Sequence, residues 1–477
     1  MKKMKLAAVA AATLMAATTI GTLAGCTDKE HTISVFLLTN ATETKVYKQY
    51  FKDLEKEIEE DTGVRYKIDY VGKEKDDYYT KLLTDVGRGN VPDVFYLRPN
   101  EMLWYQDVIT DLQDFANTQD FANLNGIYQK ALDMYRFNPE TREIGNPQDH
   151  LYAFPKDLST QQLGYNRTLV EKYQSVFETL KLPLPWDMGD TPYTWTEYKA
   201  IVEGIANKIA ADGEKKQFAS DVPSIEVLAH SYAVHAGKSD FSLINLPDGK
   251  REEGVVTSIT EGPVADAIKY QAELVDAGAN YKAGTYENFT SGWVCFYGLT
   301  ASWEVKEYNT MIGDGKWGVM PWPVVAKGEK WNGLITSAGY VVSKQCASME
   351  KGDIAKRIAI SFLSDATQEK FVKDEKITLP LRSSVQEDYK NPENDGIYSP
   401  DSRGIFLDVI SGDHGFLPAT YSTYNSAWLE ELSKALEVMW LKGKGYALSY
   451  YNSALSDGTW AKVQRDMQAK YDDNKQY

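Results

Sequence analysis

Histidines and glycine-rich stretches are the first places to look for catalytic chemistry in this chain. None of its five histidines belongs to an HExxH zinc motif, and the chain contains no GxSxG nucleophile elbow and no Walker-type phosphate loop. Gly313 to Gly318 matches GxGxxG, but the dinucleotide fingerprint needs a strand before it and a helix after it. Here a helical pattern precedes it and strand-like residues follow. We therefore interpret this stretch as a turn, and we expect no enzyme.

Carboxylates and cysteines leave two other kinds of chemistry open. The 68 Asp and Glu residues could include an acid pair for glycoside hydrolysis, because their spacing in the fold is not visible in a sequence. Cys295 and Cys346 have no CxxC or Cys/His spacing that would hold zinc. We expect both to be buried thiols, with a disulfide between them as the alternative. The sequence predicts neither a metal site nor a cofactor.

The N-terminal segment has the pattern of an export signal. MKKMK carries three lysines, and an apolar stretch follows from Leu6 to Thr22. It ends in Leu-Ala-Gly-Cys at 23–26, which resembles the bacterial lipobox, whose cysteine receives a lipid and becomes the new N-terminus. We expect a lipoprotein signal peptide at 1–25, lipidation of Cys26, a tether at 26–30 and a protein anchored at the outer face of the cell membrane. An ordinary secretory signal is the alternative.

Composition narrows the class of protein and partner. A chain of 477 residues suggests two or three domains or one large bilobal body, and 43% hydrophobic and 25% charged residues are typical of soluble globular proteins. The net charge of −16 works against binding the phosphate backbone of nucleic acid. The 11 Trp, 31 Tyr and 16 Phe residues indicate surfaces for ligand recognition, because aromatic rings bury well and keep a polar handle.

Alternating strand and helix patterns open the part of the chain that follows the tether. Strand patterns at 31–38, 64–70 and 94–97 flank helical patterns at 46–58 and 76–86. This order predicts a mainly parallel sheet with helices on both faces, in which ligands bind beyond the carboxyl ends of the strands. The loops there supply the candidate binding residues Asn40, Glu43, Arg98 and Glu101. Helix capping by Thr42 or Thr44 is the alternative role for the first loop.

The later patterns are helical from about 166 to 278, strand-rich at 317–325 and 334–342, and helical again at 354–363 and 427–441. The segments at 182–192 and 247–254 are expected to be surface loops, since they are rich in proline or in glycine and polar residues.

Several short blocks, in order along the chain, resemble one bacterial family. They read DYYTKL at 77–82 with GNVPDV at 89–94, YAFPKD at 152–157 with YN at 165–166, YTWTEY at 193–198, ASW at 301–303, GVMP at 318–321, GYVVS at 339–343 and LPLR at 379–382. Together with the lipobox they resemble the extracellular solute-binding proteins of bacterial ABC sugar importers, in the maltodextrin-binding-like class (solute-binding family 1). The blocks span nearly all of the chain after the signal.

The resemblance implies an α/β fold of two lobes that close on a ligand, with the chain crossing the hinge three times. By the placement of the blocks, we expect crossings near 154–155, 320–322 and 379–381. Lobe one would then comprise 30–154 plus 322–380, and lobe two 155–321 plus 381–477.

The resemblance also implies ligand-binding residues beyond the first loops. Trp303 matches the family's stacking tryptophan, and Trp428, at the start of the last amphipathic helix, is the second stacking candidate; core packing is the alternative for both. Arg382 follows the third crossing, where its planar fork could hold two hydroxyls or the carboxylate of Asp157, although it could also be an ordinary surface arginine. Asp157, Ser159 and Tyr340, in or beside the matching blocks, complete the set.

The function implied is capture of an oligosaccharide by a lipid-anchored monomer that delivers it to ABC permease subunits. The residues after the PDV block, 97–101, depart from the aromatic and acidic pair of maltodextrin-binding relatives, so maltose-type specificity does not follow. A secreted glycoside hydrolase and a binding protein for a non-sugar solute, such as a peptide or polyamine, are the alternatives.

Overall fold

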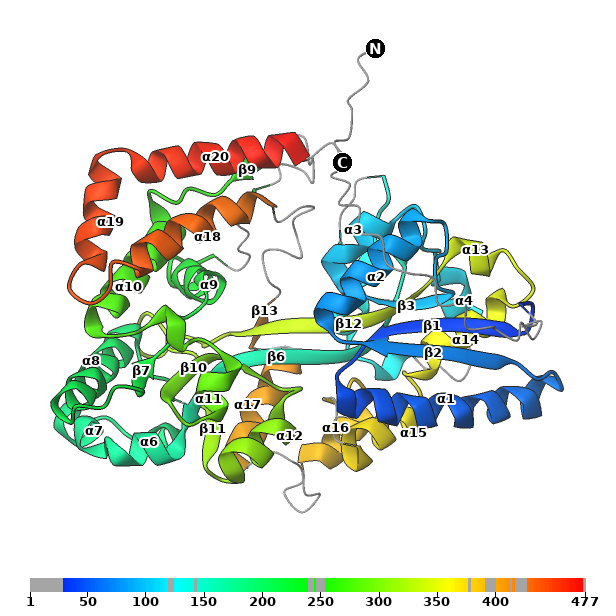
Figure 1. The fold of residues 1–477 in the computed structure, drawn as a ribbon, viewed down its shortest axis with the longest axis horizontal. Coiled ribbons are helices and arrows are strands. Elements are labelled where there is room, and N and C mark those ends of the chain that lie inside the picture. Colours follow the sequence, from blue (N-terminus) through cyan, green and yellow to red (C-terminus); the bar gives the residue numbers. More distant parts are fainter. Residues whose placement is uncertain are drawn as a thin grey trace, which may run out of the picture.

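A computed structural model shows a mixed α/β protein of two lobes, which a pair of long strands joins (Figure 1). The structure describes residues 29–474 apart from 119–123, 141–143, 190, 239–243, 246–253, 376–378, 391–399, 412–413 and 417–426. Among the described residues, no helix is both long and apolar enough to cross a membrane.

The central feature is a nine-stranded sheet that runs through both lobes in the order β2-β1-β3-β12-β6-β10-β7, with β11 paired to β6 and β13 to β12. Its strands are β1 (Thr32–Leu38), β2 (Lys67–Lys73), β3 (Val94–Leu97), β6 (Phe154–Asn166), β7 (Phe218–Ser220), β10 (Val294–Ala301), β11 (Trp317–Met320), β12 (Gly333–Val342) and β13 (Gly415–Phe416). Two small hairpins pair β4 (Arg136–Phe137) with β5 (His150–Leu151) and β8 (Ile244–Asn245) with β9 (Val255–Val256).

Lobe one carries β1, β2 and β3 and a first set of helices (Figure 1). These are α1 (Ala41–Thr62), α2 (Lys75–Gly87), α3 (Met102–Tyr105), α4 (Gln113–Thr118), α5 (Gln129–Asp133), α13 (Lys344–Ala347), α14 (Gly352–Ser361), α15 (Asp365–Glu369) and α16 (Ser383–Lys390). The parallel β2-β1-β3 order confirms the predicted β-α-β-α-β start. The whole sheet is mixed rather than mainly parallel, because β12 is antiparallel to both β3 and β6.

Lobe two carries β7, β10 and β11 and a second set of helices (Figure 1). These are α6 (Arg167–Lys172), α7 (Gln174–Leu180), α8 (Trp195–Ala211), α9 (Ile225–His235), α10 (Gly262–Ala277), α11 (Tyr286–Thr290), α12 (Val305–Tyr308), α17 (Pro400–Ile410), α18 (Ala427–Trp440), α19 (Ala447–Ser456) and α20 (Thr459–Asn474). One buried cluster joins α8, α10 and α18 to α20 of lobe two. The other includes β1, β3, α1 and α14 of lobe one together with residues of β10, β11, α12 and α17.

The strand β6 is itself a crossing between the lobes. Its first half, Phe154 to Gln161, pairs with β12, and its second half, Gln161 to Asn166, pairs with β10 and β11. The third crossing was predicted near 379–381, but this segment contacts lobe one. Tyr128 N donates to Leu381 O, and the following helix α16 packs on α15 of lobe one. Helix α16 therefore packs with lobe one, whereas α17 contacts β11 and β6.

Cys295 and Cys346 are both buried free thiols. The alternative of a disulfide between them is therefore wrong for this structure. The GxGxxG match also has the predicted setting, because helical turns precede Gly313 and β11 begins at Trp317.

Candidate functional site

A cavity of about 670 Å³ lies between the lobes, and residues of both lobes and of the joining strands line it. Six of the predicted binding residues are among its lining residues: Asn40, Glu43, Arg98, Asp157, Ser159 and Trp303. The cavity size falls within the range of small-molecule sites in proteins. The loops after β1 and β3 thus meet here, as the rule for the carboxyl ends of parallel strands predicts.

The first loop builds its part of the wall from a helix cap. Asn40 Oδ1 accepts a hydrogen bond from Glu43 N at 2.8 Å, and Glu43 Oε2 accepts one from Asn40 N at 3.1 Å. This capping box starts α1, so the cap is Asn40 rather than Thr42 or Thr44. Glu43 also binds Lys156, through Oε1 at 2.8 Å. Both oxygens of Glu43 therefore have protein partners before any ligand arrives.

Lys156 reaches the cavity because β6 contains a β-bulge. Ala338 of β12 pairs with Asp157 and Gly339 pairs with Pro155, so Lys156 is the extra residue of the bulge. In a regular strand, neighbouring side chains point to opposite faces, and a bulge re-aims one of them. Here the side chains of Lys156 and Asp157 both line the cavity, with Lys156 Nζ 3.7 Å from Asp157 Oδ2.

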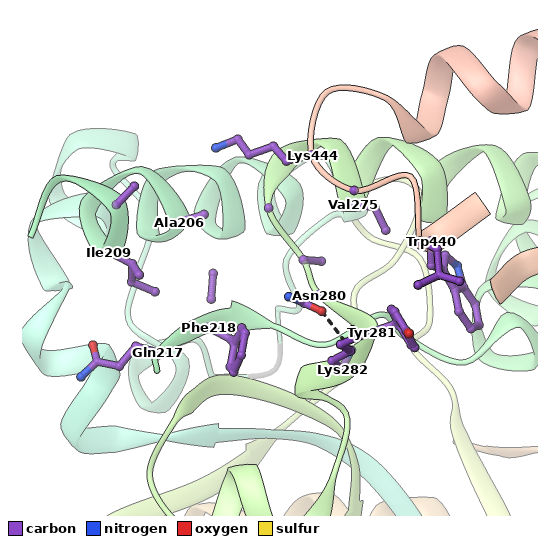
Figure 2. A pocket seen from close by; sticks show the side chains of 16 residues that line it. Ala206, Ile209, Gln217, Phe218, Val275, Asn280, Tyr281, Lys282, Trp440 and Lys444 are labelled. Atoms are coloured by element: carbon purple, nitrogen blue, oxygen red, sulfur yellow. Dashed lines mark hydrogen bonds between the residues drawn. The ribbon is translucent and has the colours of Figure 1, made fainter. Parts of the chain in front are cut away.

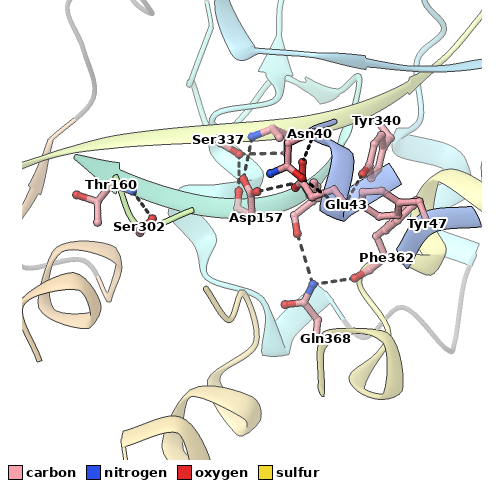
Figure 3. A network of polar contacts seen from close by, with 12 residues as sticks. Asn40, Glu43, Tyr47, Asp157, Thr160, Ser302, Ser337, Tyr340, Phe362 and Gln368 are labelled. Atoms are coloured by element: carbon pink, nitrogen blue, oxygen red, sulfur yellow. Dashed lines mark hydrogen bonds and ion pairs between the residues drawn. The ribbon is translucent and has the colours of Figure 1, made fainter. Parts of the chain in front are cut away.

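The cluster of Glu43, Lys156 and Asp157 is nearly closed to solvent. Figure 3 shows the polar contacts that surround Glu43 and Asp157. Burial lowers the pKa of Lys156, but the carboxylates of Glu43 and Asp157 outweigh burial and hold that pKa above its ordinary value. Burial raises the pKa of Asp157, although Lys156 and the backbone N–H of Ala338 oppose the shift. Asp157 Oδ1 accepts from Ala338 N at 3.1 Å, and Ser337 Oγ donates to Asp157 O at 2.7 Å. The bond from Ala338 N fixes the Asp157 carboxylate of β6 against β12, and the bond from Ser337 holds the backbone of Asp157 there.

Arg98 forms the wall after β3, and Glu101 supports it from behind. Arg98 Nη2 donates to the hydroxyl of Tyr79 at 2.6 Å, and Arg98 Nε lies 3.1 Å from Glu101 Oε1. Glu101 is buried and does not line the cavity. Glu101, which was predicted to lie at the cleft, therefore supports Arg98 and is not part of the cavity wall.

Lobe two contributes aromatic rings and carboxylates to the opposite wall. These residues are Tyr286, Trp303, Glu304 and Glu307. Trp303 remains 36% exposed, which distinguishes it from the core tryptophans Trp195 and Trp322, at 2% and 1%. This exposure favours the stacking interpretation of Trp303 over core packing.

Two predicted residues, Tyr340 and Arg382, lie elsewhere. Tyr340 is buried in lobe one, where its ring packs 4.1 Å from that of Phe362. Arg382 is also buried, donates from Nη1 to Leu363 O at 2.7 Å and forms an ion pair with Asp365. Neither lines the cavity. Trp428 belongs to α18, but its side chain lies outside the described part of the structure.

Sequence reasoning missed several wall residues, among them Tyr79, Lys156, Gln161, Tyr286, Glu304 and Glu307. Three of them carried a signal: Tyr79 lies inside the DYYTKL block, Lys156 lies inside the YAFPKD block, and Glu304 directly follows the ASW block. Tyr286 and Glu307 had none, because only the tertiary fold brings α11 and α12 to this wall.

A second cavity of about 390 Å³ lies in lobe two among α8, β7, α10 and the end of α18 (Figure 2). Tyr281 and Trp440 stack at one end of it, with ring centroids 6.0 Å apart. It shares no lining residue with the cavity between the lobes and contains none of the predicted binding residues. Within the described ranges, no group of three or more His, Cys, Asp or Glu residues could hold a metal ion.

Comparisons with known proteins agree with this architecture. A family model described as bacterial extracellular solute-binding protein matches residues 53–397. No curated protein sequence matches. Among solved structures, the ABC substrate-binding protein Lmo0181 from Listeria monocytogenes, in complex with cycloalternan, is 17% identical with a TM-score of 0.62, over 90% of this chain and 98% of that chain. The sugar-binding protein MalE from Xanthomonas citri is 16% identical with a TM-score of 0.62, over 92% and 98%. The GacH receptor of Streptomyces glaucescens, solved without ligand and with acarbose, is 16% identical with a TM-score of 0.62, over 93% and 98%.

Proposed function

The chain belongs to the bacterial extracellular solute-binding proteins, and from that premise we propose that it captures an oligosaccharide between its lobes and delivers it to an ABC transporter permease. The observation that carries the proposal is the cavity of about 670 Å³, which the partly exposed indole of Trp303 lines together with polar side chains of the other lobe. Sugars present apolar C–H faces and rings of hydroxyl groups, and this wall offers partners for both.

The polar groups of the cavity suit hydroxyl ligands. Ionised carboxylates accept hydrogen bonds, whereas Asn, Gln and Arg side chains donate them. Asn40 and Gln161 supply amides, Arg98 a guanidinium, and Asp157 and Glu304 carboxylates. Structures of similar fold include proteins described with cycloalternan and acarbose, which supports a saccharide as the ligand.

The place of action proposed is the outer face of the membrane. Cys26, the expected lipid attachment site, lies outside the described residues, so this part of the proposal rests on the lipobox-like sequence. The permease subunits are the expected partners because family members of this kind supply importers. We propose that the protein acts as a monomer and performs no catalysis.

A calorimetric screen tests the binding proposal. Purified protein without its signal peptide would be titrated with neutral oligosaccharides of different linkage, and the sugars recovered afterwards would be analysed by chromatography. We expect saturable binding of at least one oligosaccharide, which is recovered intact. Turnover of the sugar would instead support the glycoside hydrolase. Saturable binding of a peptide or polyamine, with no response to any saccharide, would support the non-sugar solute.

A further inference from the structure

The lining of the cavity between the lobes has an excess of negative charge. Five carboxylates, from Glu43, Glu74, Asp157, Glu304 and Glu307, face three cations, from Lys75, Arg98 and Lys156, which leaves two carboxylates in excess. Which of these charges can interact with a ligand matters more than their sum, because most of the cations are already paired within the protein.

The two cations that are held in the wall have carboxylate partners. Lys156 Nζ lies 2.8 Å from Glu43 and 3.7 Å from Asp157. Arg98 Nε lies 3.1 Å from Glu101. A ligand carboxylate would have to compete with these protein carboxylates for the two cations. Breaking the ion pairs within the protein would offset the free energy gained from the new contact. The third cation, Lys75, is exposed at the start of α2.

The carboxylates of lobe two are in the opposite situation. Glu304 accepts a hydrogen bond from the hydroxyl of Tyr308 at 2.5 Å, and no described residue forms an ion pair with Glu304 or Glu307. Burial raises the pKa of Glu304, and the neighbouring carboxylates of Glu307 and Glu287 raise it further. The hydrogen bond from Tyr308 opposes this shift, but burial has the larger effect on the pKa of Glu304. Both groups nevertheless line the same wall as the exposed ring of Trp303.

We propose that Glu304 and Glu307 make the site selective for uncharged oligosaccharides over those that carry uronate or other carboxylate groups. This inference rests on the proposed oligosaccharide binding. An ionised carboxylate is only an acceptor, so Glu304 and Glu307 can bind the O–H donors of a neutral sugar but not a second carboxylate. Glu304 and Glu307 would also repel a carboxylate on the ligand. This repulsion weakens the binding of acidic oligosaccharides without strengthening that of neutral ones.

The test compares two ligands that differ in one group. The first is the neutral oligosaccharide that binds best in the screen, and the second is the same oligosaccharide with a primary alcohol oxidised to a carboxylate. Their dissociation constants are measured by calorimetry at neutral pH. We expect the oxidised ligand to bind wild-type protein at least about tenfold more weakly, and the double variant Glu304→Gln/Glu307→Gln to reduce this ratio about tenfold.

A matched control separates the local effect from the overall charge of the chain. Glu203 on α8 and Glu437 on α18 are exposed and do not line the cavity. The variant Glu203→Gln/Glu437→Gln changes the net charge by the same amount and should leave the ratio of the two dissociation constants unchanged. Thermal melting of each variant verifies that it is folded.

Three results would overturn the inference. Equal or tighter binding of the oxidised ligand by wild-type protein would show that the cavity accepts carboxylates, while oligosaccharide binding itself would stand. An unchanged ratio in the Glu304→Gln/Glu307→Gln variant would show that these residues do not select the ligand. Absence of binding by neutral and oxidised saccharides alike would refute the proposed function, and the inference with it.

Discussion

Replacing Trp303 with alanine tests the stacking wall most directly. Trp303 is 36% exposed and lines the cavity. A tryptophan side chain presents roughly 250 Å², so the exposed part is about 90 Å², and covering it with a ligand stabilises the complex by about 2 kcal/mol at about 25 cal/mol/Å². The variant should therefore bind its best oligosaccharide about 30-fold more weakly. Its free energy of unfolding should change much less than the roughly 3–5 kcal/mol expected for a core tryptophan.

Calorimetry and thermal melting together decide the matter. Trp104 on α3 offers a matched control, because it is 56% exposed and does not line the cavity. Trp104→Ala should leave affinity unchanged. If Trp303→Ala kept wild-type affinity and instead lowered the melting temperature strongly, Trp303 would be a packing residue and the stacking argument would be wrong.

Three further perturbations test other parts of the structure. Lys156→Met should lower the free energy of unfolding by about 3–5 kcal/mol, because it leaves two buried carboxylates without their cation; a loss below about 1 kcal/mol in urea unfolding would contradict this. Burial raises the pKa of Asp221 to about 7. The folded state therefore keeps a proton that the unfolded chain releases near pH 4, and stability should fall by up to a few kcal/mol as the pH rises from about 4 to about 7. Asp221→Asn should flatten this dependence in melting curves, and an unchanged slope would count against it. Cys26→Ala should release the protein from membranes on cell fractionation, since acyl chains contribute about 0.8 kcal/mol per buried CH₂; continued retention would contradict the lipobox interpretation.

Local sequence patterns were enough to predict the start of lobe one and its contribution to the cavity. Alternation that turns wholly apolar predicts β1, and a short apolar run predicts β3. The rule for parallel strands then places Asn40 and Arg98 at one edge. The same information could not show that Glu43 has both oxygens engaged, because its partner Lys156 is 113 residues away in the chain.

Contacts between distant segments explain why the structure places other residues differently from the prediction. Arg382 follows a proline-bearing segment that looks like a hinge crossing, yet its guanidinium is held by Leu363 and Asp365. Tyr340 sits in a block that resembles the family, but on a strand position that faces the core of lobe one. Side-chain direction along a strand depends on register with the partner strand, which a single sequence does not specify.

The bulge at Lys156 has a consequence for how relatives are aligned with this chain. A relative that lacks the bulge has one residue fewer between the counterparts of Pro155 and Asp157. If no gap is placed there, every later residue of the strand is matched with a neighbour that points to the other face of the sheet. At identities of 16–17%, such a one-residue offset is easily introduced. Ligand contacts transferred from solved structures to Asp157 or Ser159 should therefore be assigned by superposition of strands rather than by letters alone.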